Sequence, residues 1–208
     1  MKMILASASP RRKELLEQIG FSFQVKVSTG EEKITEKDPG KAVEELALQK
    51  ALQVREQRKK ERPEERAKEE GMEIVIGADT VVVYEGQILG KPKSRENAVR
   101  MLTMLQGKTH EVYTGVAICT EEDDGKGKTF HEKSKVTFYP MTQEEIQWYV
   151  DSEEPMDKAG AYGIQGLGAR YIERIEGDYN TVVGLPVGRL YQELQAMTDH
   201  CAREQKRG

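Results

Sequence analysis

The run of residues 74–84 constrains the fold more than any other part of the chain. It reads IVIGADTVVVY, an apolar and largely β-branched segment that contains a single charged side chain, Asp79. A run of this kind is typical of a strand buried in a sheet. Glu85 and Gly86 then offer a two-residue turn into residues 87–89, so the sequence predicts a hairpin at this point.

Helical patterns alternate with further strand-like runs along the rest of the chain. Apolar periodicity predicts helices over residues 10–19, 39–70, 94–105, 142–149 and 187–197. Short apolar or alternating runs predict strands over residues 3–6, 21–27, 112–120, 128–139 and 171–175. This interleaving predicts an α/β fold on a mixed sheet, and 208 residues suffice for one large domain or two lobes around a shared cleft.

Two polar segments stand apart from this pattern. Residues 55–70 hold 13 charged residues in 16 positions, with both signs mixed. Such a mixture is typical of a solvated helical extension rather than a grip on an acidic partner, and Pro63 is expected to break it. Residues 198–208 read as a polar tail. We therefore expect a single domain over residues 1–208 that carries a charged helical insertion and this tail.

Charge, cysteine content and hydropathy exclude several classes of protein. The 32 Lys and Arg nearly balance 36 Asp and Glu, so no nucleic-acid partner is expected. Cys119 and Cys201 lie far apart and lack metal-ligand spacing, which indicates ordinary reduced thiols rather than a disulfide or a zinc site. The longest apolar runs have the length of a strand, so we expect no membrane partner and a cytoplasmic location.

The start of the first predicted helix carries an unusual set of charges. Ser9 suits the N-cap and Pro10 the first helical position. Arg11, Arg12 and Lys13 follow in the first turn, where the helix dipole disfavours cations. Free backbone N–H groups, serine hydroxyls and guanidinium groups at one helix N-terminus form a site suited to phosphate. The alternative is that these basic side chains only point into solvent.

Asp79 is the second residue that breaks a local rule. An unpaired carboxylate in so apolar a run would be costly or would become protonated. The residue is therefore expected to be a metal ligand, a general base or half of a buried ion pair, with a satisfied core acid as the alternative. Glu31 and Glu32 supply a second carboxylate position for a hard divalent ion such as Mg²⁺.

Two lysines and a glycine-rich segment add weaker signals. Lys50 and Lys91, together with the arginines, could neutralise a polyphosphate, although a single such lysine usually only buries its stem. Residues 158–168 (KAGAYGIQGLG) match neither a P-loop nor a Rossmann fingerprint. Their glycines let the backbone approach a flat ligand and Gln165 could pair with a base edge, whereas a plain flexible loop is the alternative. His110 has no catalytic partner in sequence and reads as an ordinary histidine.

These motifs, in this order, closely resemble the Maf family of nucleoside triphosphate pyrophosphatases. The matching segments are residues 4–12 (ILASASPRR), 77–81 (GADTV), 90–92 (GKP), 158–166 (KAGAYGIQG), 177–179 (GDY) and 183–186 (VGLP). The resemblance covers nearly the whole chain apart from residues 55–70 and the end of the chain. It implies an elongated α/β fold with a mixed sheet and a cleft between two lobes, related in plan to inosine triphosphatases. It also implies cleavage of a nucleoside triphosphate between its α and β phosphates.

The same resemblance implies roles for individual residues. Asp79 would act as general base or position the attacking water, and Glu32 would join Asp79 in binding a divalent cation, Mg²⁺ or Mn²⁺. The residues that would hold phosphates are Ser7, Ser9, Arg11, Arg12, Lys50 and Lys91.

Three positions distinguish the subtypes of the family. They read Arg12, Thr80 and Gln165 here, a combination similar to the subgroup that prefers dTTP and UTP, with modified pyrimidine nucleotides as further candidates. The Gln165 amide would offer a donor and an acceptor to the base, and Arg12 and Thr80 would add donors. A homodimer is compatible with the resemblance. The alternative function is that of a non-catalytic protein that senses nucleotides in septum formation.

Overall fold

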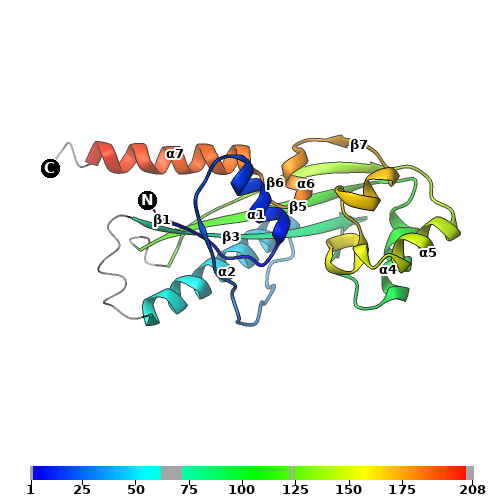
Figure 1. Ribbon diagram of the computed structural model, residues 1–208, viewed down its shortest axis with the longest axis horizontal. Coiled ribbons are helices and arrows are strands. Elements are labelled where there is room, and N and C mark those ends of the chain that lie inside the picture. Colours follow the sequence, from blue (N-terminus) through cyan, green and yellow to red (C-terminus); the bar gives the residue numbers. More distant parts are fainter. Residues whose placement is uncertain (1, 62–71, 122, 124, 205–208) are drawn as a thin grey trace.

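The structure is a computed structural model that describes residues 2–61, 72–121, 123 and 125–204, and within these residues the strands form one seven-stranded mixed sheet. The order along the sheet is β2-β1-β3-β5-β6-β7, and β4 pairs with β3 beside this path (Figure 1). The strands are β1 (Lys2–Leu5), β2 (Gln24–Val25), β3 (Glu73–Tyr84), β4 (Gln87–Leu89), β5 (Thr109–Thr120), β6 (Lys128–Phe138) and β7 (Ile172–Glu176). The predicted α/β class with a mixed sheet is confirmed.

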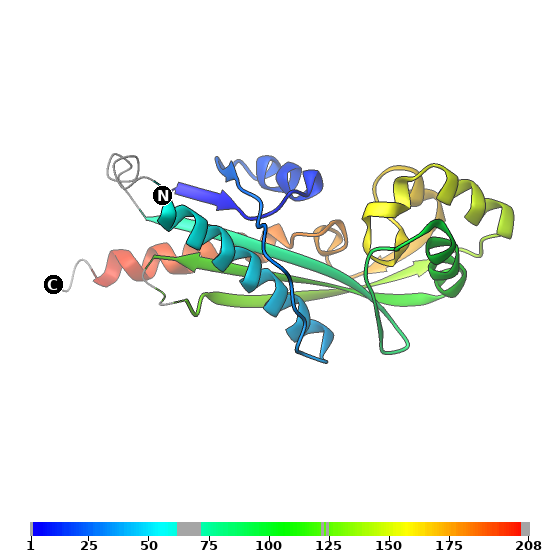
Figure 2. The same ribbon diagram turned by 90° about the horizontal axis from the view of Figure 1, so that it is seen from below.

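Helices cover the two faces and one end of this sheet. They are α1 (Pro10–Gln18), α2 (Pro39–Lys60), α4 (Arg95–Leu105), α5 (Gln143–Asp151), α6 (Tyr179–Val183) and α7 (Val187–Glu204). Short 3-10 turns complete the set: η1 (Glu154–Asp157), η2 (Ala159–Ala161) and η3 (Gly166–Tyr171). Figure 2 shows α2 lying along one face of the elongated sheet, whereas α4 and α5 gather at the far end with the 3-10 turns. No helix of the described residues is long and apolar enough to cross a membrane.

The central strand β3 has one edge that is only partly paired. On one side it runs antiparallel to β5 from Ile74 to Val83. On the other side β1 pairs in parallel as far as Ile76, and β4 pairs in antiparallel only from Val82 onward. Among the described residues, no strand therefore covers residues 77–81 of β3 on this second edge. The gap between β1 and β4 leaves room for a ligand beside the middle of the sheet.

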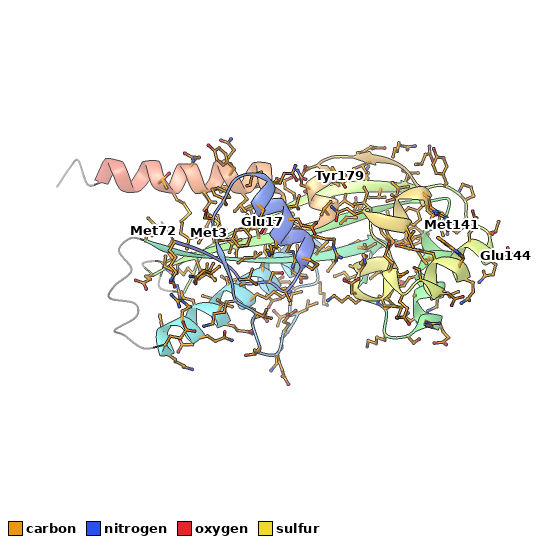
Figure 3. All side chains as sticks on the ribbon, in the orientation of Figure 1. Met3, Glu17, Met72, Met141, Glu144 and Tyr179 are labelled. Carbon is orange, nitrogen blue, oxygen red and sulfur yellow. The ribbon has the colours of Figure 1, made fainter. Side chains whose placement is uncertain are left out.

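Side chains of β3 alternate between the two faces and divide the core into clusters. Ile74 and Ile76 pack with α1 and α7, whereas Val75 packs with α2 on the opposite face. Further along the strand, Val82 belongs to a separate cluster with α4 and α5. Figure 3 shows Met3 and Met141, which lie in the first and the last of these clusters, at opposite ends of the sheet. Asp79 and Thr80 fall between the clusters.

Two glycines let α2 lie directly on the strands. A Cβ atom on Gly77 would lie 2.1 Å from the carbonyl oxygen of Ala47, and one on Gly115 would lie 2.3 Å from that of Val43. Any larger residue at these positions would force the helix outward. This close approach brings Lys50, one turn further along α2, against β3.

Most predicted elements are confirmed, with corrections at their ends. The hairpin turn at Glu85 and Gly86 has both residues at positive φ, and Thr142 with Glu145 forms a capping box at the start of α5. The strand predicted over residues 21–27 is wrong in length, because only Gln24–Val25 pairs with β1. The last helix continues to Glu204, beyond the predicted end at residue 197. The short helix α6 was not predicted.

The charged segment after residue 54 is less solvated than its composition suggests. Helix α2 ends at Lys60, and the predicted break at Pro63 lies outside the described residues. Arg55 pairs with Asp123 and donates to the carbonyl oxygen of Thr120 at 2.8 Å. Arg58 pairs with Glu73 at 2.9 Å. The expectation of a purely solvated face is therefore wrong for these two arginines, which fasten α2 to the sheet.

Candidate active site

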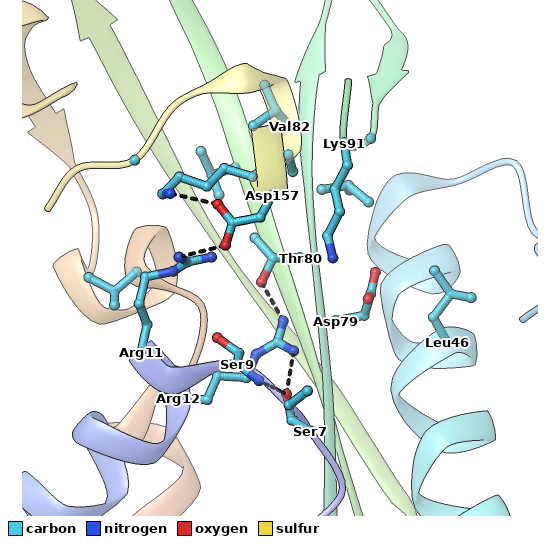
Figure 4. Close-up of a pocket in the computed structure, with 18 of the residues that line it drawn as sticks. Ser7, Ser9, Arg11, Arg12, Leu46, Asp79, Thr80, Val82, Lys91 and Asp157 are labelled. Carbon is cyan, nitrogen blue, oxygen red and sulfur yellow. Dashed lines mark hydrogen bonds and ion pairs between the residues drawn. The ribbon is translucent and has the colours of Figure 1, made fainter. Parts of the chain in front are cut away.

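A cleft of about 940 Å³ lies at the open edge of β3. Its walls are the loop between β1 and α1, the segment 27–34, the middle of β3, the loop after β4, parts of α2 and α6, and the segment from η1 to Gln165. Residues of four of the matching segments, 4–12, 77–81, 90–92 and 158–166, meet here, and Figure 4 shows how several of their side chains face one another. The volume is at the upper end of the range of small-molecule sites, roughly 300–1,000 Å³.

The position of Asp79 and Thr80 on β3 divides the cleft into two halves. Successive side chains of a strand point to opposite faces, so Asp79 turns toward α2 and Thr80 toward α1. In the interior of a sheet the strands would separate these two faces. Because the edge is open at residues 77–81, one ligand can contact both.

The acidic half of the cleft is arranged around Lys50. Its ammonium group pairs with Asp79 and lies 3.4 Å from the Oε2 atom of Glu32. The side chains of Lys50 and Asp79 are only 12% and 16% exposed, so the interpretation of Lys50 as a solvent-seeking lysine is wrong. Of the two adjacent acids, Glu32 lines the cleft. Asp79 is therefore half of an ion pair, one of the alternatives left open by the sequence.

The two carboxylates fit a hard divalent ion. Asp79 and Glu32 both pair with the ammonium nitrogen of Lys50, so the two carboxylates are close enough to bind one cation. The described residues contain no group of three or more His, Cys, Asp or Glu side chains that could hold a metal. Mg²⁺ commonly takes only one or two protein carboxylates and completes its shell with phosphate oxygens and water. The donor set fits an ion that is bound together with a phosphorylated ligand.

The basic half of the cleft is arranged around Arg12. Its guanidinium donates to the carbonyl oxygen of Gly184 at 2.8 Å and to the hydroxyls of Ser7 and Thr80, both at 3.1 Å. Burial lowers the pKa of Arg12, an effect that the nearby Asp79 opposes, yet a guanidinium stays charged in proteins. The alternative in which Arg12 only points into solvent is wrong.

The hydrogen bonds that Ser7 already makes determine what it can offer a ligand. Ser7 Oγ accepts from the backbone N–H of Ser9 at 3.2 Å and from Arg12 at 3.1 Å. Both of its lone pairs are then used, so Ser7 is left with its hydroxyl hydrogen as a donor, which suits a phosphate oxygen. In the described structure Ser9 occupies the N-cap of α1 without a capping bond from its side chain, and its hydroxyl also lines the cleft.

Arg11 and Lys91 also line the cleft, together with Arg12 and Lys50. Arg11 reaches across the cleft from α1 to Asp157 in η1, with 3.5 Å between Nη1 and Oδ2. Lys158 pairs with the other oxygen of Asp157 at 2.7 Å. Lys91 extends from the loop after β4 toward Asp79 (Figure 4). Sequence reasoning missed Asp157, whose partner Arg11 lies 146 residues away.

The glycine-rich segment forms the far wall and includes Gln165. The backbone N–H of Gly160 donates to the carbonyl oxygen of Gly90 at 3.1 Å, which ties this segment to the loop after β4. A Cβ atom on Gly160 would lie 2.8 Å from Val82, and its φ of +67° also favours glycine. Part of the segment is η2 and η3 rather than a plain flexible loop.

A buried histidine supports this wall from behind. His110 is 2% exposed, and its Nε2 atom lies 2.7 Å from the hydroxyl of Tyr162, which lines the cleft. Its Nδ1 atom is buried without a hydrogen-bond partner in the described part of the chain. Burial lowers the pKa of His110 from 6.5 to about 4. The histidine is therefore neutral at pH 7 and holds the tyrosine in place.

We expect the protein to lose stability in acid through His110. Its folded-state pKa lies below the unfolded value, so the unfolded state binds more protons between pH 6.5 and 4 and stability falls as pH drops. The free energy of unfolding is expected to fall by roughly 2 kcal/mol through His110 when the pH is lowered from 7.5 to 5. Urea unfolding of the wild type and of His110→Gln at both pH values measures how much His110 contributes to the pH dependence of stability. An equal pH dependence in the two proteins would contradict the assignment.

The fold and the cleft together define an α/β protein in which two carboxylates and several cations converge at the open edge of a mixed sheet. A family model described as Maf-like protein matches residues 2–197. The chain belongs to the Maf family.

Relatives of the chain match it over almost their whole length. The chain is 55% identical to a dTTP/UTP pyrophosphatase from Agathobacter rectalis over 199 residues, or 94% of this chain and 97% of the relative. It is 51% identical to proteins of the same name from Bacillus cereus and Bacillus anthracis. Each of these matches spans 195 residues, or 93% of this chain and 94% of the relative. Among solved structures, a dITP/XTP pyrophosphatase from Mycobacterium abscessus aligns with 97% of each chain at 14% identity and a TM-score of 0.37, a likeness too distant to inform the site.

Proposed function

We propose that this protein is a nucleoside triphosphate pyrophosphatase that acts on dTTP and UTP and releases the monophosphate and pyrophosphate. The substrates are those of the relatives at 51–55% identity. The observation that carries the proposal is the position of Asp79, which lies at the open sheet edge between the Lys50 and Arg12 groups. A carboxylate beside converging cations is the arrangement that water attack on a phosphate ester or anhydride requires.

In the proposed reaction, a water oxygen attacks the α-phosphorus and the bond to the bridging oxygen of the β-phosphate breaks. Asp79 accepts the proton of the water, and pyrophosphate leaves with the electron pair of the broken bond. Lys50 and Lys91 neutralise charge that develops on the leaving group, and no covalent intermediate is needed.

Glu32 and Asp79 are the residues that would hold a divalent ion, Mg²⁺ or Mn²⁺. When bound, such an ion supplies charge neutralisation at the phosphate oxygens. In addition to the ion, Ser7, Ser9, Arg11 and Arg12 provide donors for the phosphates, and we assign base recognition to Arg12, Thr80 and Gln165.

Product analysis in labelled water tests the proposal. Purified protein with UTP and Mg²⁺ in H₂¹⁸O is expected to give UMP that carries the label and unlabelled pyrophosphate, because attack falls on the α-phosphorus. Chelation of the metal with EDTA should stop the reaction and added Mg²⁺ or Mn²⁺ should restore it. UDP with orthophosphate as products would contradict α/β cleavage. Binding of UTP without any product would favour the nucleotide-sensing alternative.

A further inference from the structure

We propose that Thr114, a buried residue of β5 outside the cleft, is a positioning residue for base selectivity. It fixes the direction of the Thr80 hydroxyl, so that Thr80 can only accept a hydrogen bond from the ligand. The inference rests on the proposed function, because it concerns how the same site separates uracil and thymine from cytosine.

A chain of hydrogen bonds leads from the cleft into the core. Arg12 Nη2 lies 3.1 Å from Thr80 Oγ1, which lies 2.9 Å from Thr114 Oγ1. Thr114 Oγ1 in turn lies 2.7 Å from the backbone carbonyl oxygen of Thr181 in α6. Thr114 is 0% exposed, so its hydroxyl is shielded from bulk water. This series of hydrogen bonds joins α1, β3, β5 and α6.

The hydrogens available to each group fix the direction of every bond in this series. A carbonyl oxygen can only accept, so Thr114 spends its single hydroxyl hydrogen on Thr181. Thr80 must then be the donor in its bond to Thr114, since Thr114 has no hydrogen left to give. The guanidinium of Arg12 can only donate, and it fills one lone pair of Thr80. Within the described part of the chain, Thr80 therefore keeps one lone pair and no hydrogen for a ligand.

Further contacts hold Arg12 and Thr181, the two ends of this series of hydrogen bonds. Arg12 is oriented by the carbonyl oxygen of Gly184 and by Ser7. Thr181 is held by Asp178, whose Oδ2 atom accepts from its backbone N–H at 2.8 Å and from its hydroxyl at 2.9 Å. Because a cation stands at one end and a carbonyl at the other, each bond polarises the next in the same direction. Reversal of the Thr80 hydroxyl would break the whole series.

The direction of this hydroxyl bears on which pyrimidine fits. The N3 position of uracil and thymine carries a hydrogen, whereas N3 of cytosine carries a lone pair. An acceptor at Thr80 can pair with the former and faces a second acceptor in the latter, which leaves both groups unpaired. Under this proposal Thr80 offers the base an acceptor, whereas the sequence-based expectation is that it adds a donor.

Substitution of Thr114 tests the inference while Thr80 stays in place. Thr114→Val keeps the shape of the side chain but removes the hydroxyl, so Thr80 regains a free hydrogen and can donate to cytosine. We expect the ratio of kcat/KM for UTP over CTP to fall about tenfold, mainly through KM. Thr114→Ser keeps the hydroxyl and should restore the ratio. Thr114→Ala replaces the valine variant should the latter not fold.

A second threonine pair, which also joins two neighbouring strands, provides a matched control. Thr109 and Thr137 join β5 and β6 through hydroxyls 2.8 Å apart, and neither lines the cleft. Thr137→Val should lower the melting temperature as Thr114→Val does but leave the UTP to CTP ratio unchanged. In a Thr80→Val background, Thr114→Val should have no further effect on the ratio, because its action passes through Thr80.

Binding measurements separate this inference from the proposed function. The dissociation constants of α,β-methylene UTP and α,β-methylene CTP report base preference without any bond cleavage. A folded Thr114→Val protein with the wild-type ratio of these constants would overturn the inference and leave the pyrophosphatase proposal standing. Absence of UTP hydrolysis by the wild type would overturn the pyrophosphatase proposal. A weaker preference of Thr114→Val for binding the UTP analogue over the CTP analogue would still support the role of Thr114.

Discussion

Asp79→Asn is expected to lower kcat for UTP by roughly 10³-fold, the scale of a lost general base or metal ligand. The amide has the same volume and can still accept a hydrogen bond from Lys50, so the cleft keeps its shape. It carries no charge and cannot take the proton of the attacking water. Turnover and melting temperature measured on the same preparation separate the loss of chemistry from a loss of folded protein.

The pair of Arg55 and Asp123 offers a matched control. Its side chains are 12% and 20% exposed, close to the values for Lys50 and Asp79, but the pair lies outside the cleft. Asp123→Asn should therefore lower the melting temperature and leave kcat unchanged. If Asp79→Asn behaved in the same way, with full activity per folded molecule, Asp79 would be a structural acid.

Arg12→Lys is expected to lower kcat/KM for UTP by about 100-fold and the melting temperature by roughly 5–10 °C. Lysine keeps the charge but cannot direct three hydrogen bonds at once to Gly184, Ser7 and Thr80. The buried carbonyl oxygen of Gly184 then loses its bond to Arg12, and the Ser7 and Thr80 hydroxyls each lose one of their two bonds. Steady-state kinetics and thermal unfolding of the same samples measure the two effects.

The neighbouring arginine shows how far charge alone accounts for this effect. Arg11 makes a longer contact of 3.5 Å, to an aspartate that is largely exposed. Arg11→Lys should lower kcat/KM by less than about tenfold, with little change in melting temperature, because exposed ion pairs contribute little. Equal losses from both substitutions would mean that Arg12 acts only as a positive charge.

Local chemistry predicts the elements that depend on near neighbours. The run around Asp79 becomes β3, the turn at Glu85 and Gly86 forms the hairpin, and the Thr142 cap starts α5. In each of these, the residues that determine the conformation lie within a few positions of one another. The strand expected over residues 21–27 was wrong because its pairing depends on β1, which offers a partner only to Gln24–Val25.

The candidate site was only partly accessible to sequence reasoning. Residue types and spacing indicated Asp79, the cations after Ser9 and a phosphorylated ligand, and the family resemblance assigned roles to Glu32, Thr80 and Gln165. Residue types alone left Asp79 as a metal ligand, a base or an ion-paired acid, and neither approach predicted its ion pair with Lys50, which lies 29 residues away in the chain. The open edge of β3 was equally hidden, because it arises from where two other strands end.

The charged residues, the position of β3 and the resemblance of the motifs to a family can all be read from the amino-acid sequence. Which polar atoms meet, and which of them remain free for a ligand, depends on the tertiary structure. The bonds from Thr114 to Thr181 and from His110 to Tyr162 join residues 67 and 52 positions apart, and neither histidine nor threonine stands out in the sequence. Their importance follows from burial, because a hydroxyl or ring nitrogen removed from water must bond to whatever the fold places beside it.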